Sequence, residues 1–191
     1  HLARRSEFGD PEEAFICGLF RNLGENLTIY YFPEDHAEIS EMTAVGGDRE
    51  AAAKGVLGVS YAELGAEVAG IWGLPRPIID AIRGLGDARP GEPLSPAEAT
   101  RNAAVFATAL CDIADIPNAI DRQPQLAALV DRFGEALTLD QDFAIRLFAA
   151  GMEKLTTNAA ILEFDHQSSE YCRRARNWLA DTAPAAADDA A

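Results

Sequence analysis

Three histidines are the first candidates for metal chemistry, but their spacing does not favour a shared site. They are His1, His36 and His166. A dinuclear hydrolase site needs several His and Asp side chains that hold cations and activate water. No two of these histidines stand three or four residues apart, the spacing that places two ligands on one helix face. The sequence therefore predicts no metal, no cofactor and no catalytic residue.

The three cysteines also lack a spacing that would indicate chemistry. Cys17, Cys111 and Cys172 are far apart, and none belongs to a Cys-x-x-Cys pair, so neither a zinc knuckle nor a redox motif is indicated. Cys17 stands in an apolar segment with no histidine near it in sequence, and we expect it to pack in the core. All three are interpreted as buried or incidental thiols in a reducing cytoplasm.

Two carboxylates and a glycine pair have ordinary structural explanations. Glu63 and Glu67 are one helical turn apart and could form an acid and base pair, but a solvated helix face is the commoner use of such spacing. Residues 45–50 read Val-Gly-Gly-Asp-Arg-Glu and superficially resemble the Gly-Gly-Asp signature of diguanylate cyclases. That signature lies on a hairpin turn, whereas this segment lies between two helical patterns. A helix end followed by an N-cap explains it.

The last part of the chain holds the only dense basic group, formed by Arg173, Arg174 and Arg176. These arginines could bind a phosphorylated or acidic partner, or they could balance acidic surface in the same molecule, which is the commoner arrangement. Trp72 and Trp178 are interpreted as core or interface anchors rather than as groups that stack on a cofactor.

Composition limits the partners that the protein can have. The chain has 191 residues, with 31 Asp and Glu against 16 Lys and Arg, and a formal charge of -15. A field of that sign repels nucleic-acid backbones and anionic lipid, so we expect no nucleic acid and no membrane among the partners. No apolar run is long enough to cross a bilayer. We expect a cytoplasmic protein.

Helix signals recur along the whole chain, and no alternating strand pattern is sustained, so the expected fold is all-α. Asp48 is a predicted N-cap, and Ser60 with Glu63 and Ser95 with Glu98 are predicted capping boxes. The first core helix is expected to present Ile16, Leu19, Phe20, Leu23 and Leu27 on one stripe. The expected helices run from Pro11 towards Pro33, from Pro33 to Gly46, and over 49–57, 61–72, 75–84, 96–116, 123–133, 140–164 and 168–179.

The expected organisation is one helical core with a flexible end. Residues 1–84 are expected to form the C-terminal part of a helical core, and residues 85–95 a Gly- and Pro-rich linker or loop. Residues 96–182 supply further helices that pack on the same core. The tail, residues 183–191, has too little apolar bulk to pack and is expected to be disordered.

Two segments carry a family resemblance, Glu13–Glu25 and Gly58–Ala69. The sequence resembles the HDOD domain, a helical signalling relative of the HD and HD-GYP phosphohydrolases. In the metal-dependent relatives the first segment reads His-Asp-Ile-Gly-Lys and the second begins His-Pro-Glu-x-Gly, and each histidine is a ligand. Here the first reads Arg-Asn-Leu-Gly-Glu over residues 21–25, and Tyr61 stands in the place of the second histidine. Asp112 is the one residue left on the helix that carries the final ligand in HD enzymes.

The resemblance implies an HD-like helical bundle and a bacterial regulatory module that is not an enzyme. Such a module would act by contact with a signalling protein partner or a fused signalling domain. The alternatives are a phosphohydrolase of nucleotides or cyclic dinucleotides, and a nucleotide sensor in which Arg21 neutralises phosphate. The family has further helices before the segment that begins here at Glu12. We therefore expect that those helices are missing or cleaved away, or that a second copy in a homodimer covers the apolar face they leave.

Overall fold

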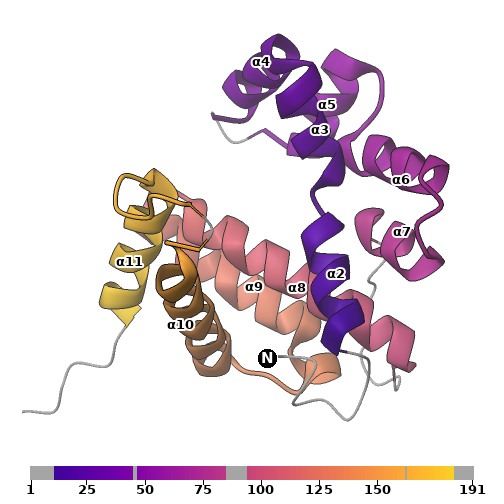
Figure 1. Cartoon of the computed structure of the whole chain (residues 1–191). Coiled ribbons are helices and arrows are strands. Elements are labelled where there is room, and N and C mark those ends of the chain that lie inside the picture. Colours follow the sequence, from indigo (N-terminus) through magenta and orange to yellow (C-terminus); the bar gives the residue numbers. More distant parts are fainter. Residues whose placement is uncertain (1–10, 45–46, 85–93, 162, 183–191) are drawn as a thin grey trace, which may run out of the picture. The chain divides into compact units, whose positions relative to one another are not determined.

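The computed structural model describes residues 11–44, 47–84, 94–161 and 163–182, and every regular element in these ranges is a helix (Figure 1). This confirms the all-α class. The helices are α2 (Pro11–Phe20), α3 (Leu23–Tyr31), α4 (Pro33–Ala44), α5 (Arg49–Leu57), α6 (Tyr61–Ile71), α7 (Arg76–Ile82), α8 (Pro96–Asp115), α9 (Ala119–Leu137), α10 (Gln141–Asn158) and α11 (Glu170–Thr182).

The chain divides into two compact units, residues 1–108 and residues 109–191, and α8 contributes residues to both. The expected boundaries at residues 84 and 96 stay a prediction. Most of the expected loop, the expected tail and the glycine at position 46 lie outside the described residues.

The helix starts follow the local capping signals of the sequence. The Asp48 side chain accepts a hydrogen bond from the amide three residues later at 2.7 Å. Ser60 and Glu63 form a complete capping box at the start of α6. Ser95 and Glu98 exchange the equivalent bonds at the start of α8. Each cap satisfies amides that have no partner within the first helical turn. The predicted starts of α5, α6 and α8 are confirmed.

The predicted first core helix is wrong in its continuity and in its buried face. The helix ends at Phe20 and a second begins at Leu23, with a turn between them. Two residues of the expected stripe are exposed, Ile16 at 38% and Leu19 at 63%, whereas Cys17 is fully buried. The segment before Pro33 is helical, as predicted.

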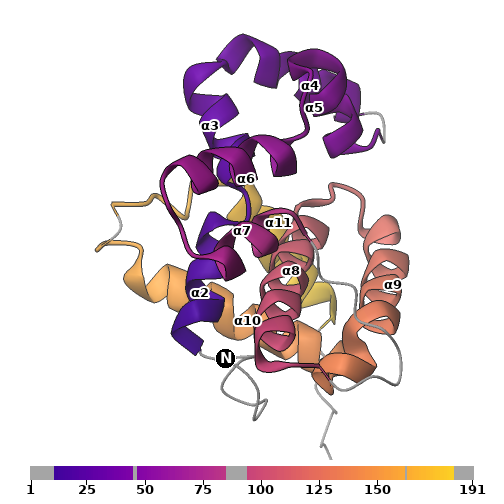
Figure 2. The ribbon, with the colours of Figure 1, turned by 90° about the vertical axis from the view of Figure 1, so that its right-hand side faces the viewer.

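The first unit contains two apolar clusters. One joins α2, α3, α6, α7 and α8 and is built mainly from small side chains: Cys17, Leu23, Ala66, Ala69, Ile78, Ala81, Ile82 and Ala104. The other joins α4, α5 and α6 through Ile39, Ala52, Ala53 and Tyr61. The helix pair α6 and α7 lies side by side in both views (Figure 1, Figure 2). Because most of these side chains are small, the helix backbones can approach closely.

In the second unit α9 is longer than predicted. It begins at Ala119, four residues before the predicted start, and it continues through Gly134 to Leu137. The left-handed residue that ends it is Thr138, with φ 52°. A Cβ on Gly134 would lie 2.8 Å from the Leu139 carbonyl oxygen. This glycine therefore allows the returning chain to pack close, and it does not end the helix.

The last two helices also differ from prediction at their ends. α10 ends at Asn158 rather than near residue 164, and Ile161 beyond it is 80% exposed. α11 extends to Thr182. Trp178 is a core residue, as predicted, and its ring lies 5.1 Å from that of Phe148.

Candidate functional site

The two family-like segments meet where α3 crosses α6. A Cβ added to Gly24 would lie 1.9 Å from the Tyr61 carbonyl oxygen and 2.9 Å from the Gly65 amide nitrogen. A Cβ added to Gly65 would lie 2.8 Å from the Gly24 nitrogen. The two helices therefore touch backbone to backbone, and only glycine fits on either side. Arg21 and Asn22 directly precede α3, and Tyr61 is the first residue of α6.

Arg21 occupies the turn between α2 and α3 and reaches the end of α7. Its Nη1 donates a hydrogen bond to the Ile82 carbonyl oxygen at 2.9 Å. That carbonyl belongs to the last turn of α7, where the helix dipole favours a cation and the backbone acceptors lack helical partners. Gly84, with φ 69°, lies close to the same guanidinium. Asn22 precedes α3 without a side-chain capping bond.

Tyr61 stands where the resembling segment of the metal-dependent enzymes has its histidine, and its side chain makes apolar contacts. The residue is 4% exposed and belongs to the cluster with Ile39, Ala52 and Ala53. Its hydroxyl has no hydrogen-bond partner among the described residues. Burial, and then the Glu25 carboxylate, raise the pKa of Tyr61, while Arg49 opposes the shift. The side chain is therefore a neutral phenol at physiological pH.

A small charge network lies beside Tyr61, and the sequence did not reveal it. Glu25, the last residue of the first segment, accepts a hydrogen bond from Arg49 at 3.1 Å. His36 Nε2 lies 3.8 Å from the other Glu25 oxygen. The three residues come from α3, α4 and α5, so no local spacing could have predicted their meeting. Glu25 stands where the metal-dependent relatives have lysine, and here it joins three helices.

The remaining metal candidates do not converge. Among the residues that the structure describes, no group of three or more His, Cys, Asp or Glu side chains is placed to hold a metal ion. His36 contacts Glu25, whereas His166 and Asp112 belong to the second unit. His1 lies outside the described residues.

The two glutamates of α6 each have a local structural role. Glu63 caps the helix and accepts a hydrogen bond from Lys54 at 3.2 Å. The Ser60 amide and then Lys54 lower the pKa of Glu63. Glu67 lies 3.5 Å from Arg83 at an exposed position. Because each carboxylate faces a cation at the surface, the pair is not arranged as an acid and a base.

Two of the three clustered arginines bind carboxylates of the same unit. Arg174 lies 2.6 Å from Asp115 and 3.0 Å from Glu170, and Arg173 lies 3.1 Å from Glu170. These bonds agree with the interpretation that the cluster balances acidic surface within the molecule. Of the two tryptophans, Trp72 is 55% exposed, so it is not a core residue.

Cys17 is placed for packing rather than for reaction. It is fully buried, and its Sγ lies 3.8 Å from the Pro77 carbonyl oxygen. Burial, and then Glu13, raise its pKa to about 11. A thiol with that pKa stays protonated and is a poor nucleophile. The predicted packing role of Cys17 agrees with this position.

Residues 1–85 match the family model described as the HDOD domain. This part of the chain is similar to the HDOD domain. Gly24 and Gly65 of the two segments lie at the crossing of α3 and α6. No described helix combines the length and the apolar composition that a membrane crossing requires.

Two proteins to which the chain is similar are both longer than this chain. Over 72 residues the chain is 35% identical to an uncharacterized protein of Treponema pallidum (strain Nichols), a match covering 37% of this chain and 14% of that protein. A crystal structure from Shewanella amazonensis SB2B, provisionally named a phosphohydrolase, has a TM-score of 0.49 and 24% identity. That similarity covers 88% of this chain and 55% of the other. The chain thus spans only part of the length of either relative.

Proposed function

We propose that the HDOD-related part is a regulatory module of a bacterial signalling protein that acts by protein contact and catalyses no hydrolysis. The proposal is supported by the contacts of Arg21 and Tyr61, the residues that stand where the metal-dependent relatives have histidine ligands. Arg21 donates to the Ile82 carbonyl, and Tyr61 is buried in an apolar cluster. A guanidinium cannot ligate a cation, and a buried neutral phenol offers no anionic oxygen to one.

Arg49 and His36 both contact Glu25, and the three residues, which lie near Tyr61, come from three helices. Glu25, one of the carboxylates whose charge acts on Tyr61, binds Arg49 and approaches His36, and so links three helices. Activation of a water for attack on phosphorus requires a metal or a poised base. Neither requirement is met by the contacts of these residues, which supports a role in contact rather than in turnover.

The partner of such a module is a signalling protein or a signalling domain fused to it. The family resemblance supports this class of partner, and the acidic charge of the chain favours a protein over a nucleic acid or an anionic membrane. A second copy of the chain remains an alternative partner, and light scattering in solution would reveal it.

The proposal is tested by incubating the protein with cyclic di-GMP, guanosine nucleotides and an aryl phosphodiester in the presence of Mg²⁺, Mn²⁺ or Fe²⁺. We expect product formation equal to that of the buffer blank. Turnover that scales with protein concentration and survives a further chromatographic step would contradict the proposal. Calorimetry with the same nucleotides separates the alternatives, because binding without turnover would instead support a nucleotide sensor.

A further inference from the structure

Four consecutive large apolar residues are exposed where α3 ends. Ile29, Tyr30, Tyr31 and Phe32 are 48%, 77%, 65% and 50% exposed, and the two tyrosine rings pack edge to face with centroids 4.8 Å apart. Met42 on the next helix is 46% exposed. Soluble proteins seldom expose such a group without a use, and aromatic residues are enriched in the anchor positions of interfaces. We call residues 29–32 the aromatic patch.

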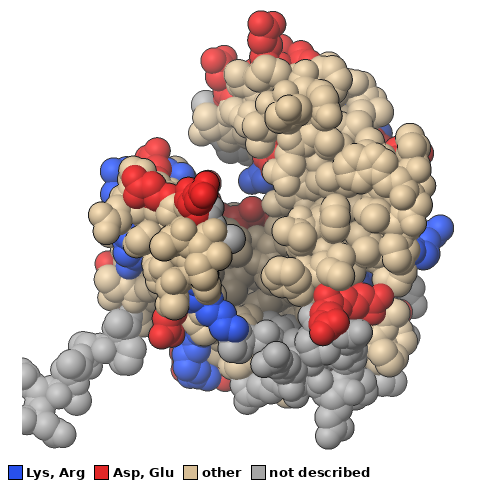
Figure 3. All heavy atoms as spheres, in the orientation of Figure 1, with Lys and Arg blue, Asp and Glu red and all other residues tan. Residues whose placement is uncertain are grey.

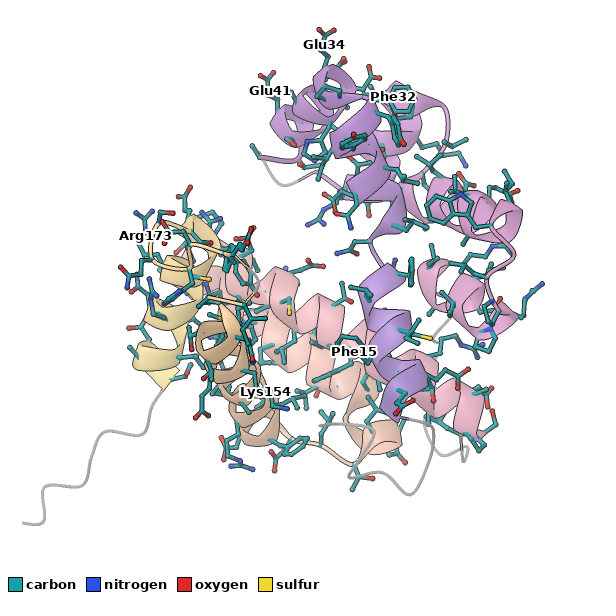
Figure 4. The ribbon with its side chains drawn as sticks, viewed as in Figure 1. Phe15, Phe32, Glu34, Glu41, Lys154 and Arg173 are labelled. Carbon is teal, nitrogen blue, oxygen red and sulfur yellow. The ribbon has the colours of Figure 1, made fainter. Side chains whose placement is uncertain are left out.

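Three carboxylates lie on α4, directly after the aromatic patch, and we call Glu34, Glu38 and Glu41 the acidic row. Glu34, Glu38 and Glu41 are exposed and follow the i, i+4, i+7 spacing that places them on one helix face. None of the three makes an ion pair with another described residue. Figure 4 shows Glu34 and Glu41 pointing away from the helix, with Phe32 close by. Acidic side chains project from this part of the surface in Figure 3.

The charge around the patch is of one sign. No Lys or Arg stands between Arg21 and Arg49, and this interval contains six Asp and Glu residues: Glu25, Glu34, Asp35, Glu38, Glu41 and Asp48. The basic side chains at the two ends of this interval already have partners, because Arg21 donates to the Ile82 carbonyl oxygen and Arg49 is paired with Glu25. A ligand of the patch must therefore bring its own positive charge to meet the row on α4.

We propose that the aromatic patch and the acidic row form a docking surface for a basic amphipathic helix of a partner protein. The apolar side of that helix would cover Tyr30 and Tyr31, and its Lys or Arg side chains would meet Glu34, Glu38 and Glu41. Glu34 and Glu41 are seven positions apart, or about 10 Å along α4, which matches two turns of a bound helix. This inference rests on the proposed function and adds the chemistry of the partner.

Charge also argues against the other occupants of this surface. A symmetric contact with a second copy would bring together two surfaces of the same negative sign, which is repulsive. An anionic membrane would be repelled in the same way. A helix with Leu-like residues on one side and Lys or Arg along the flank satisfies both the apolar and the charged parts of the surface.

The probe for this surface is a peptide of about 18 Leu and Lys residues in amphipathic helical order. Binding is measured by fluorescence anisotropy at about 0.15 M salt, where attraction to distant charge is screened. The same peptide with Glu in place of Lys tests the sign of charge. A peptide of the same Leu and Lys composition in scattered order tests the need for an apolar face.

Two variants of the protein remove the two parts of the surface. They are the double variant Tyr30→Ser with Tyr31→Ser and the triple variant Glu34→Gln, Glu38→Gln and Glu41→Gln. All five positions are exposed, so both variants should keep the helical circular dichroism and urea midpoint of the parent. Matched controls change equally exposed residues of the second unit: Ile120→Ser with Ile161→Ser, and Asp131→Asn with Glu135→Gln and Glu153→Gln.

We expect each patch variant to weaken binding of the Leu and Lys peptide by about tenfold or more, and each control to stay within about twofold. Hydrogen exchange should slow over residues 23–44 when the peptide is present. Equal binding by patch variants and parent, equal losses in the controls, or protection confined to other residues would overturn the proposal. Self-association that the tyrosine variant abolishes would overturn it too, because it would assign the surface to a second copy.

The two proposals fail in different experiments. Loss of the peptide result without nucleotide turnover would remove the docking surface and leave the regulatory function in place. Nucleotide turnover would remove the regulatory function whatever the peptide does.

Discussion

The substitution Gly24→Ala tests whether the family-like segments are retained for helix packing. The new Cβ would lie 1.9 Å from the Tyr61 carbonyl oxygen and 2.9 Å from the Gly65 nitrogen, both of which are backbone atoms. Backbone atoms of a packed helix cannot rotate away as a side chain can, so α3 and α6 must separate. Overpacking of a core typically costs about 1–3 kcal/mol, and a contact this short belongs at the upper end.

A smaller contribution to the free energy of unfolding has the opposite sign. Alanine in a helix is favoured over glycine by about 0.5–1 kcal/mol, because glycine loses more backbone freedom on folding. The net expectation for Gly24→Ala is a loss of about 2 kcal/mol, or a fall of roughly 10 °C in the melting temperature of a unit of this size. Urea unfolding followed by circular dichroism measures the free energy directly.

The control is Gly55→Ala, in the last turn of α5. A Cβ at Gly55 would meet nothing within 4 Å, so only the helix term applies, and stability should rise by about 0.5–1 kcal/mol. The two glycine changes should therefore have opposite signs. If Gly24→Ala were as stable as the parent, the close crossing of α3 and α6 would be refuted.

Three further changes test the residues around the crossing. Tyr61→Phe should raise the free energy of unfolding by about 1 kcal/mol, because the buried hydroxyl has no partner among the described residues; a lower urea midpoint would show that the hydroxyl is bonded. Arg21→Met should cost about 1–2 kcal/mol by removing the bond to the Ile82 carbonyl, and unchanged stability would contradict that role. The pKa of Glu63 is lowered in the folded protein, so its contribution is present above the ordinary pKa of Glu and is lost as the pH falls through the lowered value. In urea titrations Glu63→Gln should flatten that acid limb, and an unaltered pH profile would be the contrary result.

The helix caps could be predicted from sequence because each involves residues three positions apart. Ser60 and Glu63, like Asp48 and its amide partner, form bonds that depend only on local geometry. The all-α class and the starts of α5, α6 and α8 follow from such signals. Caps decide where a helix begins, but they say little about which of its faces is buried.

The break between α2 and α3 could not be predicted in the same way. No glycine or proline marks the turn at Arg21 and Asn22, and Arg21 is bonded to Ile82, a residue 61 positions away. The prediction that Ile16 and Leu19 are buried is wrong for the same reason. The predicted apolar stripe assumes one continuous helix. Periodicity cannot detect a break that is held by a distant carbonyl.

The candidate site was predicted in part. The replacements at Arg21, Asn22 and Tyr61 were visible in sequence, because the two segments resemble those of metal-dependent relatives. The network of Glu25 with Arg49 and His36 was not visible, since it joins three helices. Tertiary contacts of this kind leave no spacing signal along the chain.

We propose that the part of the chain similar to the HDOD domain lacks hydrolase chemistry, and the metal content of the purified protein tests this proposal. The protein is purified without chelator or affinity tag, and its iron, manganese and zinc are measured by plasma mass spectrometry against protein concentration. Far less than one metal ion per chain is expected. One or two equivalents of iron, manganese or zinc that persist through gel filtration would contradict it.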